Sequence, residues 1–170
     1  MLRSLFVALV LAALAGAGCA QSIDSKDDNF IIYNGHSADM RKAIDKARRT
    51  LAAAMEAASL GNTGRFSPEL ILKVAIPAGD GVENIWVDSI ARDSDALVGR
   101  FANEPRYLPG KRLGDTVNFS LDAVIDWSLP KSDGKLFGHY TTRIILQNIA
   151  PEEARRIRSR LSLRPAPRNW

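Results

Sequence analysis

The chain has 170 residues, of which 46% are hydrophobic and 25% charged, with Lys+Arg 23, Asp+Glu 19 and a formal net charge of +4. This composition excludes a collagen-like chain, a disulfide-stapled mini-protein and a wholly disordered polymer, and the length is that of one domain. Residues 151–170 carry six arginines and two glutamates, whereas residues 21–150 are nearly neutral. One basic tail on a neutral body does not indicate nucleic-acid binding, so no nucleic-acid partner is expected.

The N-terminus has the pattern of an export signal. Arg3 precedes an apolar run over residues 5–17, which is shorter than the roughly 20 residues of a membrane-spanning helix. Small residues follow, directly before the single cysteine, Cys19. We therefore expect residues 1–18 to be a signal peptide.

The sequence Gly16-Ala17-Gly18-Cys19 resembles the lipobox of bacterial lipoproteins, although most lipoboxes carry an aliphatic residue where Gly16 stands. We expect lipidation at Cys19, a lipid-anchored tether over residues 19–36 and a protein that faces the periplasm. By resemblance to enteric lipoproteins, Ala20 in place of an aspartate points to the outer membrane. The alternative is ordinary signal cleavage, which would release a soluble periplasmic protein. Either outcome leaves the mature domain without a free thiol, which excludes cysteine catalysis.

A long helix is predicted to begin after Ser37, a good N-cap, with Asp39 in the first turn. Gly61 is expected to end this helix as a left-handed cap. An apolar stripe at spacings of three and four runs between them and consists of Met40, Ile44, Ala47, Leu51, Met55 and Ala58.

From Leu70 onward the apolar residues alternate with a period of two, which predicts strands. Turn residues separate most of them, and the longest irregular stretch is Asn103–Gly114, where Glu104-Pro105 excludes a central strand. The predicted strands cover residues 70–76, 83–90, 97–102, 116–121, 124–129 and 136–147.

A second helix is predicted from Pro151, with Glu152 and Glu153 at its start and arginines toward its end, before an irregular proline-containing terminus. The arginine-rich tail could contact an anionic surface or an envelope protein, or its arginines could simply complement the helix dipole. The fold class is therefore α+β: a long N-terminal helix packed on an antiparallel sheet or small partly closed barrel over residues 37–150, then a short C-terminal helix in the basic segment 151–170.

Several short motifs occur in order along the domain: Glu83-Asn84-Ile85-Trp86-Val87, Gly99, Asn103-Glu104-Pro105, Gly114-Asp115, Ile125-Asp126-Trp127 and Gly138-His139-Tyr140-Thr141-Thr142-Arg143. Together they resemble the YegJ-like bacterial family DUF2314, a domain of unknown function. The resemblance runs from about Ser37 to Leu146 and leaves out the arginine-rich end from Pro151. It implies a compact bacterial domain, sometimes exported, and no agreed activity.

The polar and aromatic side chains that could bind a ligand or partner are concentrated in this series. One interpretation is a groove in which an indole face packs against a ligand while Asp126 and Arg143 orient that ligand. The other is that the tryptophans anchor the core, that Asn103 forms a turn, and that Asp126 and Arg143 form a cross-strand ion pair. The candidate binding residues are Trp86, Asn103, Asp126, Trp127, Tyr140 and Arg143.

Sequence motifs for catalysis and metal binding are mostly absent. There is no glycine-rich phosphate loop, no nucleophile elbow and no His-Glu-x-x-His motif, and neither His36 nor His139 has a second ligand at metal spacing. His139 has the pKa range of a general acid or base, but its place beside Gly138 in a turn favours a solvated surface position. No metal, cofactor or catalytic residue is predicted.

These observations favour a non-catalytic binding or interaction module of the cell envelope, anchored to the membrane by lipid. One alternative is an immunity-type or inhibitor protein that binds a toxin or lytic enzyme. Another is an envelope hydrolase that uses Asp126 and His139, which requires these two side chains to meet within hydrogen-bond reach in a concave site.

Overall fold

The computed structural model of the chain describes residues 30–31 and 37–170. The expected signal peptide, the lipidation site Cys19 and most of the tether lie outside the described residues. The two described residues of the tether form the short strand β1 (Phe30–Ile31), which pairs with β3.

Helix α1 (Ala38–Ala57) begins as predicted, because the Ser37 side chain accepts a hydrogen bond from the Met40 amide at 3.2 Å. The apolar stripe is confirmed: Ile44, Leu51 and the other predicted positions are buried, and only Met40 is partly exposed. The helix ends four residues before Gly61. Gly61 does have a left-handed φ of +65°, but it opens the short 3₁₀ helix η1 (Gly61–Thr63).

Five of the six predicted strands form, and every strand pair is antiparallel. The strand order is β5-β4-β3-β2-β6-β7, and the sheet is not closed because its end strands β5 and β7 do not pair. The 3₁₀ helix η2 (Leu121–Ala123) leads into β6. The strands are β2 (Ile71–Ala78), β3 (Gly81–Asp93), β4 (Ala96–Phe101), β5 (Thr116–Phe119), β6 (Val124–Pro130) and β7 (Leu136–Gly138).

The sixth predicted strand, residues 136–147, is wrong beyond Gly138. Strand β7 stops there, and helix α2 (Tyr140–Ile145) follows. Gly138 and His139 have left-handed φ angles of +75° and +56°, which an extended strand cannot contain. The β-branched residues that follow favour strands by propensity, but tertiary hydrogen bonds to the start of α2 outweigh that preference.

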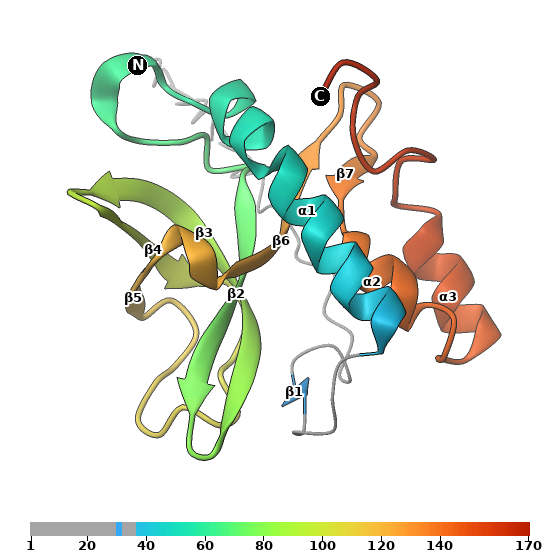
Figure 1. Cartoon of the computed structure of the whole chain (residues 1–170), viewed down its shortest axis with the longest axis horizontal. Coiled ribbons are helices and arrows are strands. Elements are labelled where there is room, and N and C mark those ends of the chain that lie inside the picture. The colour runs from blue at the N-terminus through green and yellow to red at the C-terminus, as the bar shows by residue number, and fades with distance from the viewer. Residues whose placement is uncertain (1–29, 32–36) are drawn as a thin grey trace, which may run out of the picture.

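The two faces of the sheet are buried by different side chains. Helix α1 crosses one face (Figure 1), which is apolar and includes Leu72, Val87 and Trp127. The Trp127 indole donates to the Ala47 carbonyl oxygen of α1 at 3.1 Å and fixes the helix on the sheet. Because successive strand residues point to opposite faces, Lys73, Trp86 and Asp126 point away from α1.

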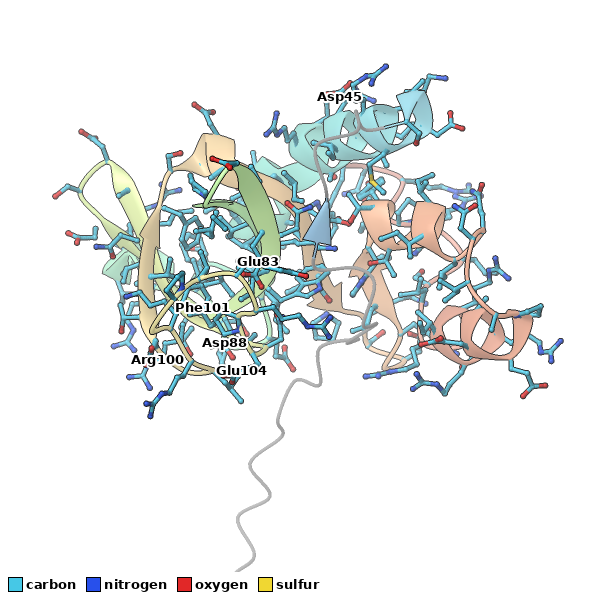
Figure 2. The ribbon with its side chains drawn as sticks, turned by 90° about the horizontal axis from the view of Figure 1, so that it is seen from below. Asp45, Glu83, Asp88, Arg100, Phe101 and Glu104 are labelled. Carbon is cyan, nitrogen blue, oxygen red and sulfur yellow. The ribbon has the colours of Figure 1, made fainter. Side chains whose placement is uncertain are left out.

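The long connection between β4 and β5 is held by side-chain acceptors. The buried Glu83 carboxylate accepts the Arg106 amide at 2.8 Å and the Tyr107 amide at 2.9 Å. In Figure 2, Glu83 lies between α1, on which Asp45 is labelled, and the loop that carries Glu104. This connection is irregular, as predicted, but its backbone is fixed by these bonds.

Helix α3 (Pro151–Arg158) forms as predicted. It lies beside α2 at the β7 end of the molecule (Figures 1 and 2) and buries a second apolar cluster with Leu146, Ile157 and Leu161. The irregular terminus beyond it packs back onto the domain, because the Pro165 carbonyl oxygen accepts the Gly138 amide and Trp170 lies 5.7 Å from the Trp127 ring. The basic segment is therefore an integral part of the domain.

Candidate functional site

Two of the predicted binding residues, Trp86 and Asp126, lie with His139 in one buried group, here called the polar cluster. Each member is at most 4% exposed. The cluster is formed from β2, β3 and β6, from the turn that leads into α2 and from the first turn of α2 itself. Its members are Lys73, Trp86, Asp126, Ser128, His139, Thr141 and Thr142.

Asp126 holds the start of helix α2. Its carboxylate accepts hydrogen bonds from the amides of Trp127 at 2.8 Å, Tyr140 at 3.1 Å and Thr141 at 2.7 Å, and from the Thr141 hydroxyl at 2.7 Å. Burial raises the pKa of Asp126, while the bonds from Thr141 and Trp127 and the charge of Lys73 act in the opposite direction. All of these partners are internal, so the carboxylate serves to fix the fold at this turn.

His139 is buried, and the prediction of a solvated surface position was wrong. The left-handed turn at Gly138 and His139 brings the imidazole over β6, where Nε2 lies 2.9 Å from the Ser128 hydroxyl. Its Nδ1 lies 3.2 Å from the Thr142 hydroxyl, and its ring centroid is 5.0 Å from that of Trp86. Burial, together with the positive charges of Lys73, Arg143 and Arg160, lowers the pKa of His139 to about 3. The imidazole is therefore neutral at pH 7.

The arrangement required by the hydrolase hypothesis is not formed. Within the described chain, Asp126 and His139 make no hydrogen bond to each other, because each is bonded to other groups. Neither side chain lines the open groove described below.

Trp86, in the middle of β3, meets Asn103 just beyond the end of β4. The Asn103 side-chain oxygen accepts the Trp86 backbone amide at 2.9 Å, and the Lys73 ammonium lies 5.5 Å from the Trp86 ring centroid. Among the described residues, Trp86 Nε1 and Asn103 Nδ2 are buried donors without an acceptor. Each such group costs about 1–3 kcal/mol of stability, which the surrounding packing must offset.

Arg143 does not form the cross-strand ion pair with Asp126 that one interpretation of the sequence offered. Its guanidinium donates to the carbonyl oxygens of Gly138 at 3.3 Å and Ser162 at 2.9 Å, and no ion pair joins it to Asp126 in the described part of the chain. Burial lowers the pKa of Arg143. The side chain thus ties the turn before α2 to the C-terminal segment.

Trp127 and Tyr140 belong to the other side of the sheet. Their rings are 6.1 Å apart in the core under α1, and the Thr50 hydroxyl donates to the Tyr140 hydroxyl at 3.1 Å. Burial raises the pKa of Tyr140. The structure therefore brings Trp86, Asp126 and His139 together and separates them from Trp127 and Tyr140.

An open groove lies beside the C-terminal half of α1, and sequence reasoning missed it. It has a volume of about 610 Å³ and is lined by α1, by residues 59–66, by the end of β3 and by η2. Leu51, Met55 and Phe66 contribute buried apolar surface, and Leu121 is 48% exposed. Three arginines and one glutamate line it as well: Arg48, Arg65, Arg92 and Glu56.

The arginines of the groove differ in how they are held. Arg48 donates to the carbonyl oxygens of Asp122 at 2.7 Å and Val124 at 3.0 Å, so its position is fixed. The Arg92 guanidinium lies 5.6 Å from the Phe66 ring centroid, and Arg65 is exposed. No local sequence pattern joins these residues, because they come from four separate segments.

Residues 37–163 match the model of DUF2314, described as an uncharacterized protein conserved in bacteria. The chain belongs to this family. The DUF2314 match starts at the N-cap of α1 and continues through α3, so it extends beyond Leu146, where the resemblance in the sequence was placed, and includes most of the basic segment. No curated protein and no solved structure matches the chain.

Two further properties of this DUF2314 domain concern metals and membranes. Over residues 30–31 and 37–170, no group of three or more His, Cys, Asp or Glu side chains is placed to hold a metal ion. The helices within the same ranges are too short or too polar to cross a membrane.

Proposed function

We propose that this DUF2314 protein is a non-catalytic binding module of the bacterial cell envelope, exported by its N-terminal signal and anchored by lipid at Cys19. The groove beside α1 is the binding surface. The observation that carries this proposal is the contrast between that open groove and the closed polar cluster.

The polar cluster supports a structural role for the residues that could otherwise catalyse a reaction. A general acid or base must reach its substrate and exchange a proton near the working pH. His139 is 2% exposed and has a pKa of about 3. The carboxylate oxygens of Asp126 accept hydrogen bonds from the amides at the start of α2. Neither group meets those requirements.

The groove supports the binding role because Leu121, Arg65 and Arg92 are exposed to solvent above a floor that contains Met55 and Phe66. Single exposed apolar residues are ordinary on protein surfaces, but Leu121 lies in a concavity that also contains Met55 and Phe66. A concave apolar surface with a few convergent charged groups is the general form of a binding site.

Site-specific photo-crosslinking in the native host tests this role. A photoreactive amino acid replaces Ala52, which lines the groove, in the full-length protein. The control position is Lys46, which is exposed on another side of α1 and does not line the groove. We expect a discrete adduct from position 52 and none from position 46. Equal labelling at both positions, or none at either, would contradict the proposal.

The anchoring part of the proposal is tested by the intact mass of the mature protein from the membrane fraction. A mass that begins at Cys19 and is enlarged by acyl chains is the expected result. A mass that begins near Gln21 without lipid would instead establish a soluble periplasmic protein, and the lipid anchor would be withdrawn.

A further inference from the structure

We propose that the groove beside α1 binds an acidic peptide segment of a partner protein. The apolar side chains of the peptide would lie on the floor of the groove, and its carboxylates would bind Arg65 and Arg92. This inference rests on the proposed binding function and adds the chemical class of the occupant. Charge, shape and chain length argue for it separately.

The groove carries a net positive charge. Three arginines line it against the single acid Glu56. Within the described ranges, neither Arg65 nor Arg92 forms an ion pair with a carboxylate of this chain. Guanidinium groups bind carboxylates through two parallel hydrogen bonds, so free arginines at the rim select an anionic occupant.

The arginines of α3 provide an internal comparison. Arg155 pairs with Glu152 at 2.6 Å, Arg156 approaches Glu153 at 3.9 Å, and Arg158 donates to the Leu146 carbonyl oxygen at 2.7 Å. These side chains already have partners within the domain. Compared with these three arginines of α3, Arg65 and Arg92 therefore have more cationic capacity left for a ligand.

The shape of the groove favours a peptide over a small amphiphile. From Arg48 to Glu56 it follows α1 for eight residues, or about 12 Å, which is the length of about four extended residues. Arg65, Arg92 and Leu121 are exposed at its margin, so an occupant held there keeps contact with solvent. Small-molecule sites bury most of their ligand, whereas peptide grooves bind one face and leave the other in solvent.

The acidic segment of this chain itself has little reach toward the groove. Strand β1 fixes Phe30 beside Glu83, and Arg92 lies nine residues farther along β3, at most about 30 Å away because the strand bends at its bulge between Asp88 and Ala91. The aspartates at 24, 27 and 28 precede Phe30 by at most six residues, which span about 20 Å when fully extended. We therefore assign the occupant to another molecule.

Peptide display on the full mature protein tests the inference. A library of random 12-residue peptides is selected against the purified protein, and the enriched peptides are measured by fluorescence anisotropy. We expect them to combine aspartate or glutamate with apolar residues. The double variant Arg65→Glu/Arg92→Glu should weaken their binding by about tenfold or more. Leu121→Asp should weaken it comparably, and Lys111→Glu, on the exposed loop between β4 and β5, should leave it unchanged.

The outcomes separate this inference from the function on which it rests. Enriched peptides that are neutral or basic, yet still lose affinity with Leu121→Asp, would keep the binding groove and overturn the acidic class. A complete lack of peptides sensitive to Leu121→Asp would overturn both. If phosphatidylglycerol vesicles bind through Arg65 and Arg92 and no peptide does, the occupant is a membrane and the inference is wrong.

Discussion

The polar cluster and the groove both bring basic and aromatic side chains together, but they differ in which groups are left to bind a ligand. In the polar cluster, Asp126 and His139 are bonded to neighbouring residues and almost fully buried. In the groove, Arg65 is exposed and the Arg92 guanidinium lies over the Phe66 ring.

This difference shows that residue type alone does not locate a binding surface. The polar cluster contains residue types that are common in catalytic and binding sites, but here they stabilise a turn and a short helix. The groove consists of residue types common on any helical domain, and its concavity makes them available. The comparison can be tested by its consequences for stability, which should be large in the cluster and small in the groove.

The largest effect is expected from Gly138→Ala. A Cβ at this position would overlap the Trp127 carbonyl oxygen, and the residue has a φ of +75°. We expect a loss of about 4 kcal/mol or more in the free energy of unfolding, or failure to fold. Gly134→Ala is the matched control, because its φ is +76° and nothing lies within 4 Å of its Cβ. Urea denaturation that finds equal losses for both would remove the steric explanation.

The variant Trp86→Ala tests whether the Trp86 indole packs in the protein interior or recognises a binding partner. The side chain is 2% exposed and contacts His139 and Lys73, so we expect a loss of about 3–5 kcal/mol on urea unfolding. Trp86→Phe, which keeps an aromatic ring, should lose much less. If Trp86→Ala remained stable and lost partner binding, Trp86 would be a recognition residue and the comparison would fail.

The variant Asp126→Ala should lower the free energy of unfolding by about 3 kcal/mol, because it leaves the amides of Tyr140 and Thr141 without their acceptor at the start of α2. Asp122→Ala, at an exposed position, is the control and should change stability by less than about 0.5 kcal/mol. Hydrogen exchange of the Thr141 amide should accelerate in the first variant. Unchanged exchange there would mean that the carboxylate does not hold α2.

The pH dependence of stability tests the buried imidazole. In the unfolded chain His139 titrates near 6.5, but in the folded protein its pKa is about 3. Below pH 6.5 the unfolded state therefore takes up a proton that the folded state does not, and stability falls by up to about 1.4 kcal/mol per pH unit until about pH 3. Asp126 acts in the opposite direction: its pKa is raised above 3.8, so its stabilising contribution is present at low pH and is lost as pH rises through its folded pKa.

The variant His139→Asn isolates the histidine contribution, since asparagine tolerates the left-handed backbone at this position. Subtracting its unfolding free energy from that of the wild type at each pH should leave the His139 slope alone. If the unfolding free energies of the two proteins fell in parallel between pH 6.5 and 4, the imidazole would not be held neutral.

The smallest effect on stability is expected in the groove. Arg65→Glu should change the unfolding free energy by no more than about 0.5 kcal/mol, because the side chain is exposed and forms no ion pair with the described residues. Thermal melting of this variant and of Trp86→Ala compares the stability effect of a groove residue with that of a polar-cluster residue. A loss above 2 kcal/mol would make Arg65 structural and weaken the assignment of the groove.

The sequence alone determined the elements whose signals are local. Ser37 and the apolar stripe located α1, and the alternation of apolar residues located β2 to β6. The ordered motifs around Trp86 and Asp126 identified the DUF2314 family, and Pro151 with Glu152 located α3. Each of these patterns lies within a few residues of the element that it specifies or in a fixed order along the chain.

Only the tertiary structure decided α2, the burial of His139 and the groove. The run Thr141-Thr142-Arg143-Ile144-Ile145 favours a strand by itself, and it becomes helical because Asp126, which lies 15 residues before Thr141, binds its first amides. The groove joins Arg48, Phe66, Arg92 and Leu121 from four separate segments. Periodicity reports which face of an element is apolar, but burial and concavity depend on which elements meet, and long-range packing sets that.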